Sequence, residues 1–304
     1  MTLPRLADAK VQEQILAQRN GKKVRQYWDA AKNDARTYLH PLDPKPGTEG
    51  EDYRAISVTS ALGVLDKPGV LQWSLDQQAA VAVMETEKIM LQSPEKAFSW
   101  LRFAGGSVLT ELQERGDHVH EFMEATISGG WPPDPETVEE QQMMEQGALF
   151  LEEHWVTNAL TEVTVWSHAK EGQKNQYAGT LDLVCDLDGV PTLLDFKSAR
   201  VFQIVHVAQM AALAFADELL QEVEPLQWVR HEVPQVEQVA VLQLRPDYVD
   251  NDGEVIPAHY KLTAIPVADL KPFYYLFLGA LDAKCAMTEA KSYYKKLLAE
   301  GEQA

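Results

Sequence analysis

Two periodicities divide the chain, and the change between them falls near residue 160. Before that point apolar residues recur at helical spacing, and breaker-rich segments separate the helical stretches. The predicted helices are 7–37, 70–92 and 107–128. A fourth helix is predicted to run to about Trp155, with Asp134 as its N-cap and Pro135 as its first helical residue. Residues 40–52 are predicted to be a loop, and 57–73 contain a Lys-Pro-Gly turn that leads into a helix.

After residue 160, apolar and polar side chains alternate with a period of two, which is typical of strands. Asp188-Gly189 is a tight-turn signal between two of these segments, so they are expected to form a hairpin. The predicted strands are 160–167, 176–186, 190–197, 236–244 and 258–265, and the predicted helices are 203–222 and 267–299. Helices together with a mixed sheet indicate an α/β or α+β chain, and α/β is the expected class.

Composition excludes several classes of protein. The chain has 304 residues, of which 45% are hydrophobic and 24% charged, as in ordinary globular proteins. It has no apolar run long enough to span a membrane and no secretory h-region at its N-terminus. Its two cysteines, Cys185 and Cys285, exclude a disulfide framework and a four-cysteine iron–sulfur cluster. These features fit a reducing, cytoplasmic setting without membrane contact.

The net charge of −19 argues against a protein that coats nucleic acid by bulk attraction. The charge is uneven, because residues 1–36 hold eight Lys or Arg against four Asp or Glu, which leaves −23 on the rest. A nuclease remains compatible with this balance, since it needs carboxylates for a metal and only a local basic groove for DNA.

Carboxylates gather on the predicted strands. Asp195 and Lys197 are two apart on one strand and therefore face the same side, while Phe196 between them faces the core. The hairpin brings Asp182 opposite Asp195, and Glu162 on the preceding strand is within reach of the same patch. Unpaired carboxylates on a half-apolar face are costly, and a hard cation would offset that cost. The pattern therefore predicts a Mg²⁺ or Mn²⁺ site.

Such a site can bind a phosphodiester and activate a water molecule, and Lys197 would add positive charge beside that water. The pattern thus favours metal-dependent phosphodiester hydrolysis over a structural cluster of ion pairs. A cysteine or serine hydrolase is not indicated, because no nucleophile stands at the required spacing from a base and no G-x-S-x-G elbow occurs.

The segments YAGTLDLV, LLDFKSA and AQMAALAFAD resemble the core motifs of the PD-(D/E)xK nuclease superfamily, and especially its RecB-like, phage-type exonucleases. Gly179 to Asp182 matches the strand of the first metal ligand, Asp195 to Lys197 matches the Asp-x-Lys element, and Gln209 matches a glutamine on the following helix. The segment SVTSALGVLDKPGVLQW is also similar to the N-terminal region of these phage proteins. The superfamily's proline does not precede the first aspartate.

The resemblance implies a restriction-endonuclease-like core, with a mixed central sheet flanked by helices and a mainly helical N-terminal half. It makes the backbone carbonyl of Phe196 a further metal ligand. The segment RGDHVHEFME resembles an upstream histidine motif, which makes His120 an additional ligand supported by Glu124, with His118 as its rival. Glu162 would bind metal or position water, and Gln209 would hold the substrate or the lysine. No iron–sulfur cluster is expected, and no nucleotide, because a Gly-Lys-Ser/Thr loop is absent.

Contacts with DNA are harder to assign. The basic stretch Lys22, Lys23 and Arg25 either binds DNA phosphates or is a solvated helix face. Tyr177 and the tryptophans are either stacking residues or ordinary core. The candidate DNA-binding residues are Ser57, Thr59, Lys67, Trp73, Tyr177 and Ser198.

The expected organisation is an N-terminal arm over 1–56 and a nuclease domain over 57–304, helical to about 158 and carrying the catalytic sheet from about 159. The expected function is DNA hydrolysis, with an exonuclease acting on ends in phage or bacterial replication, recombination or repair as the first hypothesis. A structure-specific or restriction-type endonuclease and a non-catalytic DNA-end or partner-binding module are the alternatives. A recombinase or a single-strand-binding protein is the expected protein partner, in the cytoplasm of a bacterium or a phage-infected host.

Overall fold

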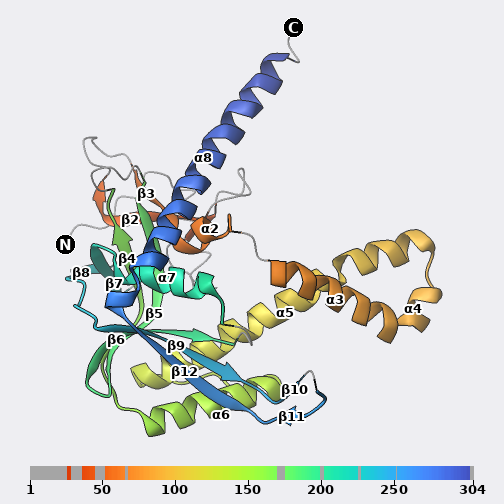
Figure 1. Ribbon diagram of the computed structural model, residues 1–304, viewed down its shortest axis with the longest axis horizontal. Helices are drawn as coiled ribbons and strands as arrows, with labels where there is room; N and C mark the ends of the chain where they lie inside the picture. Colours follow the sequence, from red (N-terminus) through yellow and green to blue (C-terminus); the bar gives the residue numbers. More distant parts are fainter. Residues whose placement is uncertain are drawn as a thin grey trace. The chain divides into compact units, whose positions relative to one another are not determined.

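The computed structural model describes most of the chain (Figure 1). The described residues are 26–28, 36–44, 52–65, 68–169, 175–198, 202–224, 227–250 and 252–301. They fall into two compact units: Met1–Val64, Leu149–Gln243 and Lys261–Ala304 form the first, and Leu65–Ala148 and Leu244–Tyr260 form the second. The predicted basic stretch at residues 22–25 and Lys67 lie outside the described residues.

A mixed sheet organises the first unit, as the sequence predicts, and the strands on one path run in the order β1-β2-β3-β5-β4-β7-β8. Strand β6 pairs with β5 and β9, and β9 also pairs with β12. The strands are β1 (Gln26–Trp28), β2 (Arg36–Pro44), β3 (Asp52–Ser57), β4 (Val156–Ser167), β5 (Tyr177–Leu187), β6 (Val190–Lys197), β7 (Glu218–Glu224), β8 (Gln227–His231), β9 (Gln238–Arg245) and β12 (His259–Pro266).

The centre of this sheet is an antiparallel meander of β4, β5 and β6, followed by helix α7 (Ile204–Ala214) and by β9, which pairs with β6 in parallel. The predicted hairpin between β5 and β6 is confirmed. Asp188 and Gly189 both have positive φ angles, 51° and 83°, which a two-residue turn between twisted strands requires. The order of strand, hairpin, strand and helix therefore matches the sequence prediction.

Helices α2 (Val58–Leu62), α7 and α8 (Lys271–Gly301) pack on one another in the first unit, and a short 3-10 helix, η1 (Val267–Asp269), precedes α8. A glycine lets two of them approach β5: a Cβ on Gly179 would lie 2.6 Å from Leu213 of α7 and 3.1 Å from Val58 of α2. The core beneath is dense in large side chains. Those that are fully buried include Trp166, Tyr177, Leu194, Phe196 and Phe277.

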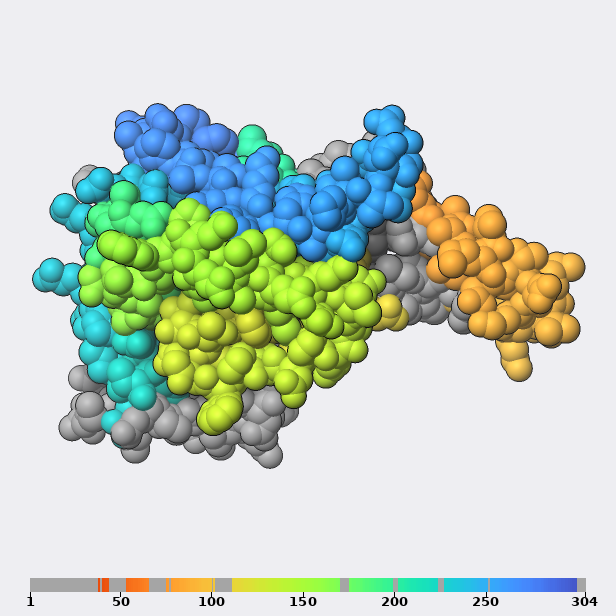
Figure 2. Space-filling view, turned by 90° about the horizontal axis from the view of Figure 1, so that it is seen from below, coloured from red at the N-terminus to blue at the C-terminus, as the bar shows by residue number. Residues whose placement is uncertain are grey.

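The second unit is mainly helical. It contains α3 (Pro68–Met84), α4 (Thr86–Met90), α5 (Pro94–Ser128), most of α6 (Val138–Glu153) and the strands β10 (Tyr248–Val249) and β11 (Val255–Ile256). Helix α3 packs along α5, and the region of α3 and α4 is the orange surface in Figure 2. Helix α5 ends where predicted, because Gly129 adopts a left-handed cap with φ 72°. No described helix combines the length and the apolar composition that crossing a membrane requires.

Several predicted elements are wrong. Residues 26–28 and 36–44 form strands instead of a helix and a loop, because their backbone pairs with neighbours across the β1–β2–β3 ladder. Helix α6 begins at Val138, where the hydroxyl of Thr137 accepts a hydrogen bond from the backbone N–H of Glu140, so Asp134 is not its N-cap. The predicted helix 203–222 ends at Ala214, and the rest becomes β7, paired with β4.

Candidate functional site

Strand register places three carboxylates in one row across the centre of the sheet. Leu183 pairs with Leu194, so the next step brings Asp182 opposite Asp195. On the other side of β5, the pairs Thr161–Leu183 and Val163–Leu181 bring Glu162 opposite Asp182. The row therefore runs from Glu162 on β4 through Asp182 on β5 to Asp195 on β6.

The side chains at the β5–β6 end of this row contact one another. The carboxylate of Asp195 is buried, with 4% of the residue exposed, and one of its oxygens lies 2.6 Å from Nζ of Lys197. The backbone N–H of Phe196 donates a hydrogen bond to Oδ2 of Asp182 at 2.8 Å. The ring of Phe196 is buried in the core. The two aspartates and the lysine thus share one small region of the sheet.

The electrostatics keep Lys197 charged. Burial by itself would lower its pKa, but the carboxylates of Asp195 and Asp182 outweigh burial and raise it above the ordinary value. At neutral pH the amine is therefore an ammonium group. It can donate hydrogen bonds to a water molecule or an anion, and it cannot serve as a general base.

Backbone strain marks the β4 end of the row. Glu162 is exposed, and its φ of 50° lies in the left-handed region that non-glycine residues rarely adopt inside a strand. Strain of this kind costs of order 1–3 kcal/mol and is concentrated at functional sites. A carboxylate held out of the regular pleat beside Asp182 is consistent with the ligand or water-positioning role predicted for it.

A further polar residue, which was not predicted, lies beside Lys197. In the parallel pairing of β6 with β9, Lys197 lies beside Gln243, which is buried to 1% exposure. The sequence did contain a signal, because Gln243 is a polar side chain inside the apolar strand predicted at 236–244. Buried amides are normally hydrogen-bonded, so Gln243 is suited to fixing the position of a neighbouring polar group.

The remaining predicted residues of the first unit lie in different settings. Gln209 is half-buried on α7, and the described residues give it no polar contact with the carboxylates. Tyr177 is fully buried, and its hydroxyl donates to the carbonyl of Ala212 at 2.9 Å, so it is a core residue and not an exposed stacking platform. Ser198 is half-buried directly after β6.

Ser57 is the N-cap of α2. Its hydroxyl, buried with the residue at 1% exposure, accepts from the backbone N–H of Ser60 at 3.0 Å. Thr59 is exposed on the same short helix. Trp73 lies in α3, and its side chain is outside the described part of the structure. Contacts of these residues with DNA stay a prediction.

The two histidines of the upstream motif belong to the second unit. His118 contacts Glu140 through Nδ1 and Oε2, 3.1 Å apart, and joins α5 to the start of α6. Burial raises the pKa of Glu140, but hydrogen bonds from the backbone N–H of Glu136 and from His118 outweigh it and lower the pKa overall. His118 thus has a structural partner. His120 is half-buried on α5, next to Val119 in the core, and its role as a ligand stays a prediction.

The donor atoms of the row are of the kind found in hard-cation sites. Asp182, Asp195 and Glu162 carry carboxylate oxygens, and the carbonyl of Phe196 would add a neutral oxygen, which are the donors that Mg²⁺ and Mn²⁺ prefer. The three carboxylates do not place one oxygen each within 4.8 Å of one another, so an ion shared by all three would require their side chains to move closer together.

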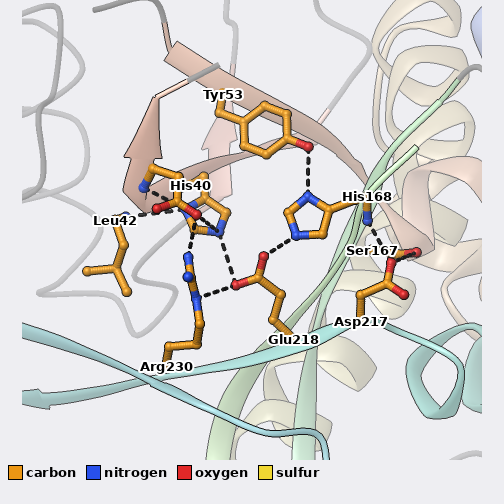
Figure 3. A network of polar contacts seen from close by, with 9 residues as sticks. His40, Leu42, Tyr53, Ser167, His168, Asp217, Glu218 and Arg230 are labelled. Atoms are coloured by element: carbon orange, nitrogen blue, oxygen red, sulfur yellow. Dashed lines mark hydrogen bonds and ion pairs between the residues drawn. The ribbon is translucent and has the colours of Figure 1, made fainter. Parts of the chain in front are cut away.

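Sequence reasoning missed a second polar cluster, which joins β2, β3, β4, β7 and β8 (Figure 3). Glu218 contacts His40, His168 and Arg230, and its Oε2 lies 2.7 Å from Nε of Arg230. The guanidinium of Arg230 also contacts Asp43. His168 contacts Glu218 through Nε2, and its Nδ1 lies 2.8 Å from the hydroxyl of Tyr53.

His40, Asp43 and Glu218 in this cluster offer donor atoms within 4.8 Å of one another, a spacing that a metal ion could bridge. Two features favour an ion-pair cluster instead. Nδ1 of His40 accepts hydrogen bonds from the backbone N–H groups of Leu42 and Asp43, so the neutral ring carries its proton on Nε2, the atom that would have to bind the metal. In addition, Arg230 already supplies positive charge to both carboxylates.

Comparison with known proteins adds little to this geometry. No family model matches the chain, and no curated protein matches it. A solved structure described as the crystal structure of LHK-Exo in complex with dAMP is similar over 60% of this chain and 85% of that chain, with 14% sequence identity and a TM-score of 0.30. A TM-score this low does not establish a common fold, so the chemistry proposed below depends on the side chains themselves.

Proposed function

We propose that this chain is a metal-dependent nuclease that hydrolyses DNA phosphodiester bonds, and that it acts as an exonuclease on DNA ends. The observation that carries the proposal is the grouping of Asp182, Asp195 and Lys197 at one point of the sheet, with Glu162 next in the row. Carboxylate oxygens are the donors that Mg²⁺ and Mn²⁺ prefer, and a lysine beside them is suited to binding a phosphate or a water molecule.

Each residue of the site would have a separate chemical role. Asp182 and Asp195 would hold Mg²⁺ or Mn²⁺ together with the carbonyl of Phe196. Such an ion lowers the pKa of bound water and stabilises charge on a phosphoryl group. Lys197, kept protonated by its two carboxylate neighbours, donates to the attacking water or to the phosphate oxygens and stabilises negative charge as it develops. Glu162 would orient the water, and Gln209 would hold the substrate or the lysine.

The experiment compares the wild type with Asp195→Asn, which keeps the side-chain volume and removes the charge. Substrates are end-labelled linear DNA, single- and double-stranded, and a closed circle, each with Mg²⁺, with Mn²⁺ and with chelator. We expect metal-dependent loss of linear DNA, reduced at least about 100-fold in the variant, which is the scale on which loss of one charge-stabilising group acts.

Asp186→Asn is the matched control, because Asp186 lies on the same strand as Asp182 and bonds to the side-chain amide of Asn158 at 2.5 Å, away from the row. The control should cleave like the wild type. Calorimetric titration with Mn²⁺ gives a second readout, since Asp195→Asn should weaken binding of the ion even where no turnover is measured. Cleavage of the circle would move the assignment to an endonuclease. Binding of DNA without cleavage under either metal would favour the non-catalytic module and refute the proposal.

A further inference from the structure

The second half of α8 leaves the core of the first unit. The helix begins among buried side chains, with Phe277, Ala280 and Leu281 at most 3% exposed. From residue 286 to residue 299 every position is exposed, including Tyr294 at 61%. Figure 1 shows this part of α8 extending beyond the sheet of its own unit. The side chains of this part of the helix therefore face solvent.

This exposed end is basic in an acidic protein. Residues 286–299 contain three lysines and one glutamate, a net charge of +2, so the remainder of the chain carries −21. Among the described residues, no other stretch of equal length to 284–296 contains as many lysines and arginines. A polyanion repelled by most of the surface would therefore be attracted here.

Three lysines of α8 lie on one side of the helix, whereas Lys296 lies on another. At 3.6 residues per turn, the half-buried Lys284 and the exposed Lys291 and Lys295 fall within about 40° of one another and form a line about 16 Å long. Tyr294 lies beside this line, about 80° away, whereas Tyr293 lies on the opposite side of the helix. We call Lys284, Lys291, Lys295 and Tyr294 the α8 stripe.

We infer that the α8 stripe binds an unpaired nucleic-acid strand. The inference rests on the proposed function and deepens it, because it assigns a substrate-holding surface to an enzyme whose overall charge repels its substrate. Lysines in a line follow a phosphate backbone, and an exposed tyrosine beside them can stack on a base, which is the combination that single-strand binders use. Duplex DNA keeps its bases stacked internally, so it would use the lysines and leave Tyr294 without a role.

The test measures binding separately from cleavage. Fluorescence anisotropy with a labelled oligothymidylate is recorded on the full chain carrying Asp195→Asn, without divalent metal, over a range of salt concentrations. Lys291→Ala with Lys295→Ala should reduce the slope of log affinity against log salt by about 1.4, since each phosphate contact of a single strand contributes about 0.7. Tyr294→Ala should weaken binding at least about five-fold.

Matched controls lie on other faces of the same helix. Lys271→Ala with Lys296→Ala removes as many charges, and Tyr293→Ala removes a tyrosine that is 65% exposed, yet none of these residues belongs to the α8 stripe. The controls should bind nearly as the wild type does. Equal losses in controls and stripe variants would mean that charge alone acts, and would overturn the inference.

Two further results would also overturn it: unchanged binding by the stripe variants, or self-association of the wild type that Tyr294→Ala abolishes, which would make the stripe a contact between copies. Cleavage assays on the stripe variants in the native Asp195 background separate the two proposals. If the stripe variants cleave with a raised KM and an unchanged kcat, the nuclease and the strand-binding stripe are both supported. If the stripe binds DNA but the wild type does not cleave it, the nuclease is refuted and the stripe is supported. If the stripe variants cleave with an unchanged KM, the nuclease is supported and the stripe is refuted.

Discussion

His40 should make the stability of the protein depend on pH between about 4 and 6.5. The ring is buried, with 6% of the residue exposed. Burial lowers its pKa from the ordinary value of 6.5 to about 4, although the carboxylates of Glu218 and Asp43 oppose that shift. The folded state therefore keeps His40 neutral over a range in which the unfolded chain is protonated.

The sign and size follow from proton linkage. Because the folded pKa is the lower one, the unfolded state binds more protons between the two values, and the free energy of unfolding falls as the pH falls. The full stability contribution is present above pH 6.5 and is lost as the pH drops to about 4. The two pKa values differ by about 2.5, and each pKa unit corresponds to 1.36 kcal/mol, so the loss is about 3 kcal/mol.

The variant that isolates this term is His40→Asn. The amide oxygen of asparagine can accept hydrogen bonds from nearby backbone N–H groups, as Nδ1 of His40 does from Leu42 and Asp43, but asparagine does not titrate. Urea unfolding at a series of pH values should give a steeper loss of stability for the wild type than for the variant below pH 6.5. Two curves that stay parallel from pH 7 to pH 4 would show that His40 is not held neutral by burial, and the reasoning would fail.

Two other perturbations test the packing of the same unit. Gly179→Ala should destabilise the fold by about 1–3 kcal/mol, because the new methyl group would lie 2.6 Å from Leu213. Thermal denaturation measures this, and an unchanged melting temperature would mean that Leu213 moves aside freely. Burial raises the pKa of the Cys185 thiol to about 12, so a thiol reagent at pH 8 should leave it unmodified until the protein unfolds. Labelling of native Cys185 at the rate of Cys285 would contradict its burial.

The sequence predicted best the elements whose signals are local. Strand β6 has the predicted bounds, Val190–Lys197, and β4, β5, β9 and β12 differ from prediction by a few residues. Alternation of period two together with an Asp-Gly turn fixes both the strands and the register between them. For the same reason the meeting of Asp182 with Asp195 could be derived from the sequence.

Elements that depend on distant partners were missed. Strand β3 pairs in parallel with β5, through Ile56 with Tyr177 and Ser57 with Ala178, across more than 100 residues of sequence. Strand β7 reads as the continuation of a helix, and it becomes a strand because Leu219 and Leu220 pair with β4 and are fully buried there. Burial against a sheet overrides intrinsic propensity in such segments.

The second polar cluster escaped prediction for the same reason. His40 falls in a segment rich in breakers, and Glu218 falls in a segment with helical periodicity, so neither carries a local sign of its partner. The contact of Arg230 with Asp43 joins residues 187 apart in sequence. The sheet brings them together, and the order of its outer strands could not be deduced from periodicity.

The two clusters differ in the partners of their carboxylates. Around Arg230, Asp43 and Glu218 contact the guanidinium group, and Glu218 also contacts the ring of His168, as expected of groups that hold strands together. In the row, Asp195 contacts the ammonium group of Lys197, Asp182 accepts a hydrogen bond from the backbone N–H of Phe196, and the backbone at Glu162 is strained. Strain of this kind is concentrated at functional sites. If the row holds a divalent cation, removal of the Asp195 charge should weaken metal binding and cleavage while leaving the fold intact.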